Sequence, residues 1–166
     1  MAKAMDIADM IITEAQNADM PVSNLKLQKV MYYLNVVHLL QFNAPLITDT
    51  KFEKWDYGPV IHSVYSEYSS NGAQNITEPA QHFNLSRDEN GQWNISYYQF
   101  NVNKMSAEDV RFVRKNLDLF LKENPFYLVD KSHEEPQWKD KSDQVYNNQK
   151  TIEFYSQSKN KFWENK

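Results

Sequence analysis

The chain has 166 residues, of which 41% are hydrophobic and 24% charged, and its net charge is −4. This size and composition predict one globular domain with a real hydrophobic core and leave no room for a second full domain. The net negative charge provides no overall attraction to nucleic acid or to an anionic membrane. No purely apolar run exceeds five residues, whereas crossing a bilayer takes roughly 20.

Cysteine is absent, which excludes a disulfide scaffold, a thiol nucleophile and a thiolate-bound metal or cluster. The first segment, Met1–Ile12, reaches Asp6 and Asp9 before any sustained apolar stretch, so it does not resemble a secretory signal. We therefore expect a cytoplasmic protein without a membrane-spanning segment.

The first part of the chain predicts two helices. Apolar residues recur at helical spacing over 7–18, which predicts a short first helix with one buried face. Ser23 can act as an N-cap for a run from Asn24 to about Phe42, in which apolar residues again share a face. We expect this longer segment to be the central helix of the domain.

The stretch 43–57 is aromatic and non-periodic, which predicts a loop or a short extended piece packed against the core. Gly58-Pro59 then predicts the start of a third helix, because a proline at the first helical position loses no hydrogen bond. Asn71-Gly72 predicts where this helix ends.

Beyond this point the residue pattern changes. The segments 82–85 and 93–100 are prone to form strands and flank a turn at 88–91, which predicts a small hairpin. Ser106 with Asp109 resembles a capping box that opens a helix running to Leu121. Two further helices are expected, a short one over 126–131 and a polar one from about Ser142. The predicted fold class is mainly α: a compact single domain of about five to six helices with a small β-hairpin insertion (α+β).

The sequence offers little that indicates catalysis. The three glycines, Gly58, Gly72 and Gly91, are too far apart for a Walker loop or a dinucleotide fingerprint. The histidines (His38, His62, His82 and His133) stand in no recognisable active-site pattern. His133-Glu134-Glu135 combines metal-ligand types, but adjacent residues point in different directions and lack the four-residue spacing that lets two ligands share one ion. We expect no catalytic residue, no metal and no cofactor.

Aromatic residues are the real excess. Six tyrosine and tryptophan residues fall within 37 positions: Tyr32, Tyr33, Trp55, Tyr57, Tyr65 and Tyr68. Core packing is the first interpretation, and rings that stay exposed would form a protein-binding surface.

Two stretches in this order resemble a known family. They are Leu25-Lys26-Leu27-Gln28-Lys29-Val30-Met31-Tyr32-Tyr33 and Trp55-Asp56-Tyr57-Gly58-Pro59-Val60, followed by His133 and Trp138. Together they resemble the Panacea domain, also called the SocA-like antitoxin or phage-associated protein family, over roughly residues 6–138. The late motif departs from the family pattern, because Gln137 separates Pro136 from Trp138.

The resemblance implies a mainly helical binding module, not an enzyme. Family members neutralise a cognate protein toxin by direct contact, and the resemblance extends to an adaptor that delivers the toxin to a bacterial protease. It implies a Panacea/SocA-like antitoxin domain over 1–140, with 141–166 as a C-terminal helix or tail of the same domain. The chain has no spare length for a helix-turn-helix, so we expect no direct DNA binding.

The resemblance also implies roles for individual residues. Lys29 and Tyr32 either point outward or brace the aromatic loop, Trp55 and Tyr57 pack that loop, and Gly58 permits a tight backbone path before Pro59 begins a helix. Whether these positions define the fold or touch the partner stays open. The residues expected to bind the partner or define the motif are Lys29, Tyr32, Tyr33, Trp55, Tyr57, Gly58, Pro59, His133 and Trp138.

Three functions compete at this stage. The first is an antitoxin that binds its toxin. The second is a phage or prophage protein that binds and modulates a host protein without a cognate toxin. The third, a hydrolase or nuclease that uses His38, His62 or His133, has the least support.

Overall fold

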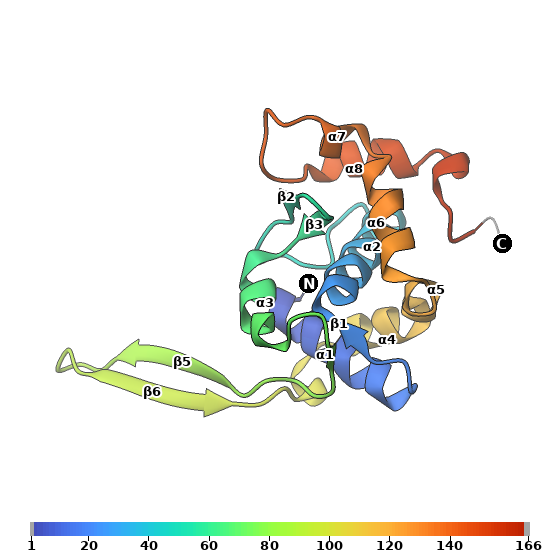
Figure 1. Cartoon of the computed structure of the whole chain (residues 1–166). Coiled ribbons are helices and arrows are strands. Elements are labelled where there is room, and N and C mark those ends of the chain that lie inside the picture. Colours follow the sequence, from blue (N-terminus) through green and yellow to red (C-terminus); the bar gives the residue numbers. More distant parts are fainter. Residues whose placement is uncertain (1, 165–166) are drawn as a thin grey trace.

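The computed structural model describes residues 2–164 and confirms a mainly helical fold with small antiparallel strand pairs (Figure 1). The α-helices are α1 (Ala4–Asn17), α2 (Asn24–Phe42), α3 (His62–Glu67), α4 (Ala107–Asn116), α5 (Asp118–Leu121), α6 (Pro125–His133), α7 (Pro136–Lys139) and α8 (Asn148–Tyr155). The strands pair as β1 (Val22–Ser23) with β4 (Asn75–Ile76), β2 (Glu53–Trp55) with β3 (Gly58–Val60), and β5 (His82–Arg87) with β6 (Trp93–Tyr98). Short 3-10 turns occupy Ser69–Asn71, Val102–Lys104 and Ser158–Asn160.

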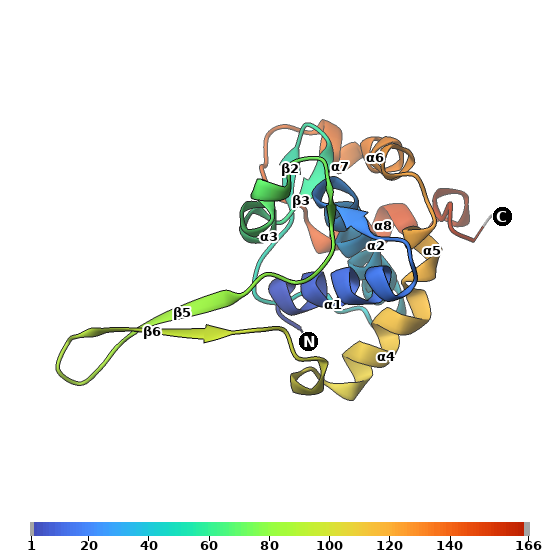
Figure 2. The same ribbon diagram turned by 60° about the horizontal axis from the view of Figure 1, so that its bottom comes forward.

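The central helix predicted from the sequence is α2, and the predicted cap is present. The Ser23 side chain accepts a hydrogen bond from the backbone N–H of Lys26, and the helix ends at Asn43 in left-handed geometry (φ 53°). α2 packs against α1, α6 and α8, which surround it in both views (Figures 1 and 2). Because several elements cover it, α2 buries side chains all around its axis instead of along one stripe.

The prediction that Pro59 begins a helix is wrong. Gly58–Val60 forms strand β3 and pairs with Glu53–Trp55, with Lys54 opposite Pro59. The N–H of Lys54 points away from β3 and donates to the carbonyl of Gln144 at 2.8 Å. Pro59 therefore stands opposite a residue that exchanges no backbone hydrogen bond with it, and its missing N–H costs nothing. α3 begins only at His62.

Two other helix boundaries differ from the prediction. The predicted cap at Ser106 is confirmed, since its hydroxyl accepts from the N–H of Asp109, but the helix divides at Leu117 into α4 and α5. Just before the division, the Asn116 side chain donates to the Phe112 carbonyl, a local bond that competes with regular helix geometry. The last helix begins at Asn148 instead of Ser142, capped by the side chain of Asn147, and residues 165–166 of the predicted C-terminal segment lie outside the described residues.

The predicted hairpin is confirmed, and it projects from the helical body as a long arm (Figures 1 and 2). Six residue pairs join β5 to β6, and the Asp88 side chain closes the turn by accepting from the N–H groups of Asn90 and Gln92. We call residues 82–98 the arm. Its base is anchored where His82 Nε2 meets Asp9 Oδ2 of α1 at 2.6 Å.

Candidate partner-binding surface

Lys29 joins the two sequence motifs inside the protein. Its side chain is fully buried, and its Nζ donates a hydrogen bond to the Pro59 carbonyl at 2.8 Å. Gln28 makes a parallel link, because its Oε1 accepts from the N–H of Ile61 at 2.9 Å. The alternative in which Lys29 points to solvent is wrong: it braces the strand pair β2–β3 from α2.

Gly58 stands at the tightest point of this contact. Its φ of +94° is a conformation that side-chain-bearing residues rarely adopt, and a Cβ placed there would lie 2.3 Å from Ser132 Oγ and 3.4 Å from Lys29 Cε. The sequence expectation of a tight backbone path at Gly58 therefore matches the geometry. The close neighbour is α6, which carries Ser132.

The late residues reach the same place. The indole N–H of Trp138 donates to the Trp55 carbonyl at 2.9 Å, and the His133 ring stacks on Trp138 with centroids 3.7 Å apart. α2, β2–β3 and α6–α7 thus share one set of contacts. We call this set, comprising Lys29, Trp55, Gly58, Pro59 and Trp138, the motif frame.

Tyr32 and Tyr33 lie on α2 but serve other parts of the core. Tyr32 is 1% exposed and donates from its hydroxyl to Glu135 Oε1 at 2.6 Å, so its outward alternative is wrong. Tyr33 is fully buried, stacks with Phe120 and donates to the Leu128 carbonyl. Both tyrosines are enclosed by the described part of the chain and present no ring surface to a partner.

Glu135 is the centre of a buried polar network. Its side chain is fully buried and accepts hydrogen bonds from Tyr32, from Gln137 Nε2 at 3.0 Å and from Tyr155 at 2.8 Å. Gln137 also donates to Thr151 Oγ1 at 2.7 Å, which extends the network to α8. In the sequence, Glu135 stood out only as a possible ligand in the metal cluster His133-Glu134-Glu135. Its burial depends on hydroxyl groups of two distant helices, which no local pattern shows.

Two buried groups titrate far from their usual range. Burial raises the pKa of the Glu135 carboxyl to about 7, although the hydrogen bonds from Tyr32, Gln137 and Tyr155 act to lower it. Burial lowers the pKa of the Lys29 ammonium to about 7. Both side chains are fully enclosed, so neither can reach a substrate in this conformation.

Tyr57 is the exception among the predicted residues, because it points outward. It occupies the turn between β2 and β3 and is 61% exposed. The expectation that it packs the loop is therefore wrong, whereas Trp55 is half-buried and packs its ring edge-on against Tyr65 with centroids 4.9 Å apart.

An apolar surface groove surrounds Tyr57. Its cavity measures about 640 Å³ and lies between the start of α2, the β2–β3 turn, α3 and the start of α6. We call it the motif groove, and its apolar lining comprises Leu25, Trp55, Tyr57, Val60, Tyr65 and Phe126. Phe126 was not among the residues predicted from the sequence; it lies directly after Pro125 and is 58% exposed. The sequence signal that could have identified Phe126 is an aromatic side chain in the first turn of a short helix.

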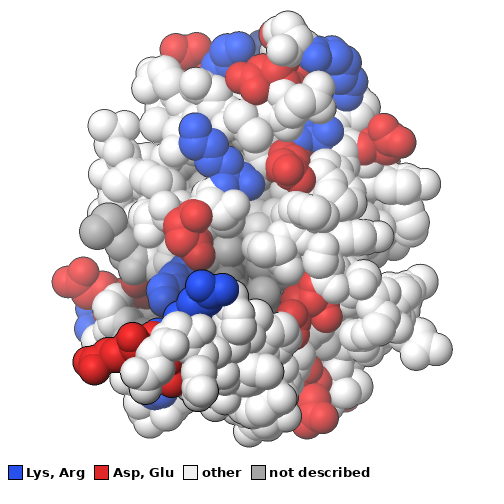
Figure 3. Space-filling model, turned by 90° about the vertical axis from the view of Figure 1, so that its left-hand side faces the viewer, with Lys and Arg blue, Asp and Glu red and all other residues white. Residues whose placement is uncertain are grey.

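Charge does not dominate the face of the molecule that Figure 3 shows. Blue and red side chains are scattered singly or in small mixed groups over a mostly uncharged surface, with no continuous patch of either sign. A partner that approaches this face meets mainly uncharged surface.

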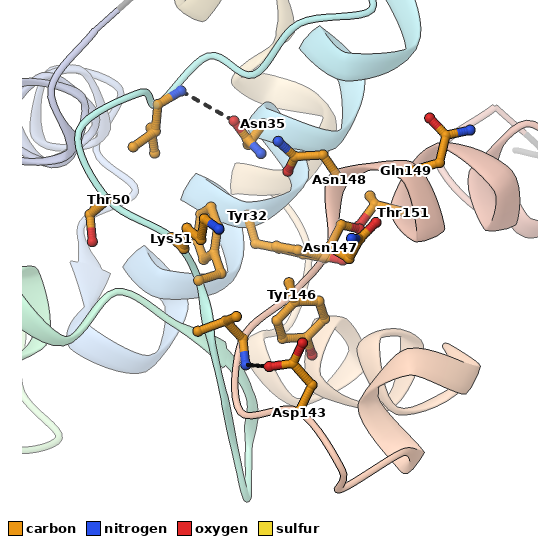
Figure 4. A pocket seen from close by; sticks show the side chains of 13 residues that line it. Tyr32, Asn35, Thr50, Lys51, Asp143, Tyr146, Asn147, Asn148, Gln149 and Thr151 are labelled. Carbon is orange, nitrogen blue, oxygen red and sulfur yellow. Dashed lines mark hydrogen bonds between the residues drawn. The ribbon is translucent and has the colours of Figure 1, made fainter.

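A second cavity, of about 310 Å³, lies between α2, the segment before β2 and the start of α8 (Figure 4). Tyr32, Lys51, Tyr146 and Asn147 are among its lining residues. Polar groups in its wall already have structural partners: Asn35 Oδ1 accepts from the N–H groups of Leu46 and Ile47, and Asp143 accepts from that of Val145. These polar groups hold the wall of the cavity together.

Within residues 2–164, no three His, Asp or Glu side chains are grouped so that they could share a metal ion. His38, His62 and His133 lie apart: His38 bonds the Ala44 carbonyl, His62 lies beside Trp55, and His133 stacks on Trp138. None of the helices in this part of the chain is both long and apolar enough to cross a bilayer.

Comparison with known proteins identifies the family. Residues 27–139 match the family described as "Antitoxin SocA-like, Panacea domain". The Antitoxin SocA of Caulobacter vibrioides (strain NA1000 / CB15N) is 36% identical over 77 residues, which are 46% of this chain and 40% of that relative. No solved structure gives a significant match. The chain belongs to the SocA-like, Panacea domain antitoxin family.

Proposed function

We propose that this member of the SocA-like Panacea family neutralises a cognate protein toxin by direct contact through the motif groove, in the cytoplasm and without catalysis. The observation that carries the proposal is the exposure of Tyr57. It is the one aromatic residue of the two sequence motifs that lies largely outside the core, and exposed Phe126 and Tyr65 lie beside it. Aromatic side chains at the centre of an apolar groove are typical anchors of protein interfaces.

The motif frame supports this proposal by fixing the groove in place. The β2–β3 turn that carries Tyr57 is held from below by Lys29 and from the side by Trp138. Anchors on a rigid support lose little conformational entropy when a partner binds. The buried residues of the frame thereby act on binding through the position of Tyr57, and Lys29, Gly58 and Pro59 serve as fold-defining residues.

The first experiment co-expresses the chain with the product of the neighbouring reading frame, and follows growth and co-purification. If the neighbour alone stops growth and the pair grows and elutes as one complex, the antitoxin proposal holds. If the neighbour is harmless and does not bind, the proposal fails, and the alternative of a phage or prophage protein that modulates a host protein is favoured.

Single substitutions then test the groove. Tyr57→Ala and Phe126→Ala should each weaken toxin binding by about 30-fold or more, the loss expected of an interface anchor. Phe42→Ala is the matched control, because Phe42 is also a half-exposed aromatic residue (53%) but lies at the far end of α2. Binding by isothermal titration calorimetry that is equal in all three variants would exclude the groove as the contact surface.

Delivery of the toxin to a protease is the finer part of the proposal. In cells that make both proteins, an adaptor shortens the half-life of the toxin, whereas a purely steric inhibitor leaves the half-life unchanged or lengthens it. Pulse-chase measurement of the toxin, with Tyr57→Ala as the non-binding control, separates the two modes.

A further inference from the structure

The two faces of the arm differ sharply in chemistry. The register places Phe83 opposite Tyr97, Leu85 opposite Ile95, and Arg87 opposite Trp93, so these six side chains share one face. The five apolar ones are between 56% and 66% exposed. We call this the apolar face of the arm. The other face carries Asn84, Ser86, Asn94 and Ser96 between the anchored base and the turn.

A two-stranded ribbon with an exposed apolar face is expected to bury that face against another protein surface. Isolated two-stranded hairpins are only marginally stable in water, and this arm projects away from the body (Figures 1 and 2). Phe, Tyr and Trp side chains carry roughly 150–250 Å² each, and Leu and Ile carry less, so the five side chains at these exposures present roughly 500–600 Å² of surface. That is the upper end of what a monomer leaves uncovered.

We propose that the apolar face of the arm is a homodimer interface, in which the arms of two copies stack face to face and antiparallel. Two such faces together present up to roughly 1,200 Å², which reaches the lower limit of specific protein interfaces. The proposal concerns a surface separate from the motif groove and does not rest on the proposed function.

The order of side chains along the face is self-complementary. An aromatic pair (Phe83 and Tyr97) lies near the body, an aliphatic pair (Leu85 and Ile95) in the middle, and Arg87 over the Trp93 ring near the turn, 4.4 Å from its centroid. A twofold axis through the aliphatic pair places each Arg87 against the aromatic pair of the other copy, a favourable cation–π arrangement. A parallel arrangement would instead place both Arg87 side chains at the same end of the interface.

The base of the arm fixes its direction, which a dimer requires. His82 Nδ1 lies 3.3 Å from Glu67 of α3, and its Nε2 lies 2.6 Å from Asp9, which also accepts from the Tyr68 hydroxyl. His82 is 4% exposed, and the Tyr98 ring covers it with centroids 5.2 Å apart. The arm is thereby held on α1 and α3 from its polar side, and its apolar face stays free for the second copy.

Sedimentation equilibrium of the purified full chain tests the dimer. The apparent mass should rise from that of one chain to that of two as the concentration increases through the micromolar range. Leu85→Glu places a charge at the centre of the interface and should keep the chain monomeric throughout. Asn84→Asp is the matched control, because it adds a charge to the adjacent residue on the opposite face and should dimerise like the unchanged chain.

The absence of cysteine makes the geometry directly testable, because one introduced thiol gives one possible cross-link. Facing sheets lie about 10 Å apart, so Leu85→Cys should give a covalent dimer with a bis-maleimide of that span. Asn90→Cys, in the turn, should not, because antiparallel stacking moves the two turns to opposite ends. A cross-link at Asn90→Cys but not at Leu85→Cys would overturn the antiparallel arrangement.

A chain that stays monomeric at every concentration and gives no cross-link at Leu85→Cys would overturn the proposal. If Leu85→Glu then also lost binding to the toxin, the apolar face would belong to the toxin interface instead. Loss of dimerisation in Leu85→Glu with toxin binding retained would support both this inference and its separation from the groove.

Discussion

The motif frame and the arm break the usual rules of burial in opposite directions. The frame and the network beside it enclose titratable groups, Lys29 and Glu135, of types that ordinarily stay in water, whereas the arm exposes apolar groups that ordinarily pack in a core. The buried polar groups of the frame and of the Glu135 network are hydrogen-bonded within the chain. The arm's apolar groups face solvent on one side of a projecting ribbon.

This difference shows what each region contributes. In the frame and in the Glu135 network, buried polar contacts join segments far apart in the sequence, such as Lys29 to Pro59 and Tyr32 to Glu135. Such contacts cost desolvation energy and specify one arrangement of the segments, which is a role in architecture. The arm contributes little to the core of the body, so its apolar residues are accounted for by an external contact.

The largest expected effect comes from Lys29, whose burial lowers its pKa from 10.5 to about 7. Between these values the folded chain binds fewer protons than the unfolded chain, so stability rises as the pH increases from 7 to 10.5. The shift corresponds to about 5 kcal/mol over the whole range. Lys29→Met should remove this rise in urea unfolding between pH 7 and 9.5, whereas exposed Lys104→Met should retain it.

Glu135 should produce the opposite slope at lower pH. Its pKa is raised from 4.5 to about 7, so the folded chain binds more protons in this range and stability falls as the pH increases through it. The corresponding change is about 3 kcal/mol. Glu135→Gln should flatten this limb in the same unfolding series, with exposed Glu134→Gln as control. An unchanged slope in Glu135→Gln would mean that the buried carboxyl does not govern it.

The next largest effect contrasts two glycines with positive φ. Gly58→Ala in the frame combines backbone strain with a contact of 2.3 Å to Ser132 Oγ, and should cost about 3 kcal/mol. Gly91→Ala, in the turn of the arm, has comparable φ (+77°) and no neighbouring atom within 4 Å, so strain alone should cost about 1–2 kcal/mol.

A double variant separates the two causes at Gly58. Gly58→Ala with Ser132→Ala removes the hydroxyl that the new methyl group meets, and should recover part of the loss relative to Ser132→Ala alone. The measurement is thermal and urea unfolding of the four chains. Equal losses of unfolding free energy in Gly58→Ala and Gly91→Ala would show that the frame accommodates the new methyl group without a penalty from the contact with Ser132.

Elements with local signals could be predicted from the sequence. Helical spacing located α1 and α2, serine caps located the starts of α2 and α4, and strand-prone residues on both sides of the turn at 88–91 located the arm. Pro59 was assigned incorrectly because proline suits both a helix start and an unpaired strand position. The strand position is favoured because the N–H of Lys54, opposite Pro59, donates to the carbonyl of Gln144. Gln144 lies some 90 residues further along the chain, so no local pattern shows this contact.

The sequence predicted which residues belong to the candidate site, but not which of their side chains are buried and which are exposed. The motifs named residues that do meet, yet periodicity could not tell that Lys29 is enclosed, because α2 buries side chains all around its axis. Periodicity could not show that Tyr57 is exposed either, because Tyr57 lies in a turn. Phe126 was missed because it joins the groove only through the packing of α6 against α2. The strand-prone segments and their turn did predict the hairpin, but whether its apolar side would face the body or solvent depends on the anchor at His82.

The smallest expected change in unfolding free energy is that of Tyr97→Ser, and it tests directly how the arm differs from the motif frame. Tyr97 is 66% exposed on the apolar face of the arm, so Tyr97→Ser removes few contacts within one chain and should change the free energy of unfolding by less than about 0.5 kcal/mol. The measurement is urea unfolding at a protein concentration low enough to keep copies apart. At high concentration the unchanged chain should gain stability over Tyr97→Ser, because association favours the folded state by mass action. A loss above about 1 kcal/mol at low concentration would instead place the apolar face of the arm within the cooperative core of the single chain.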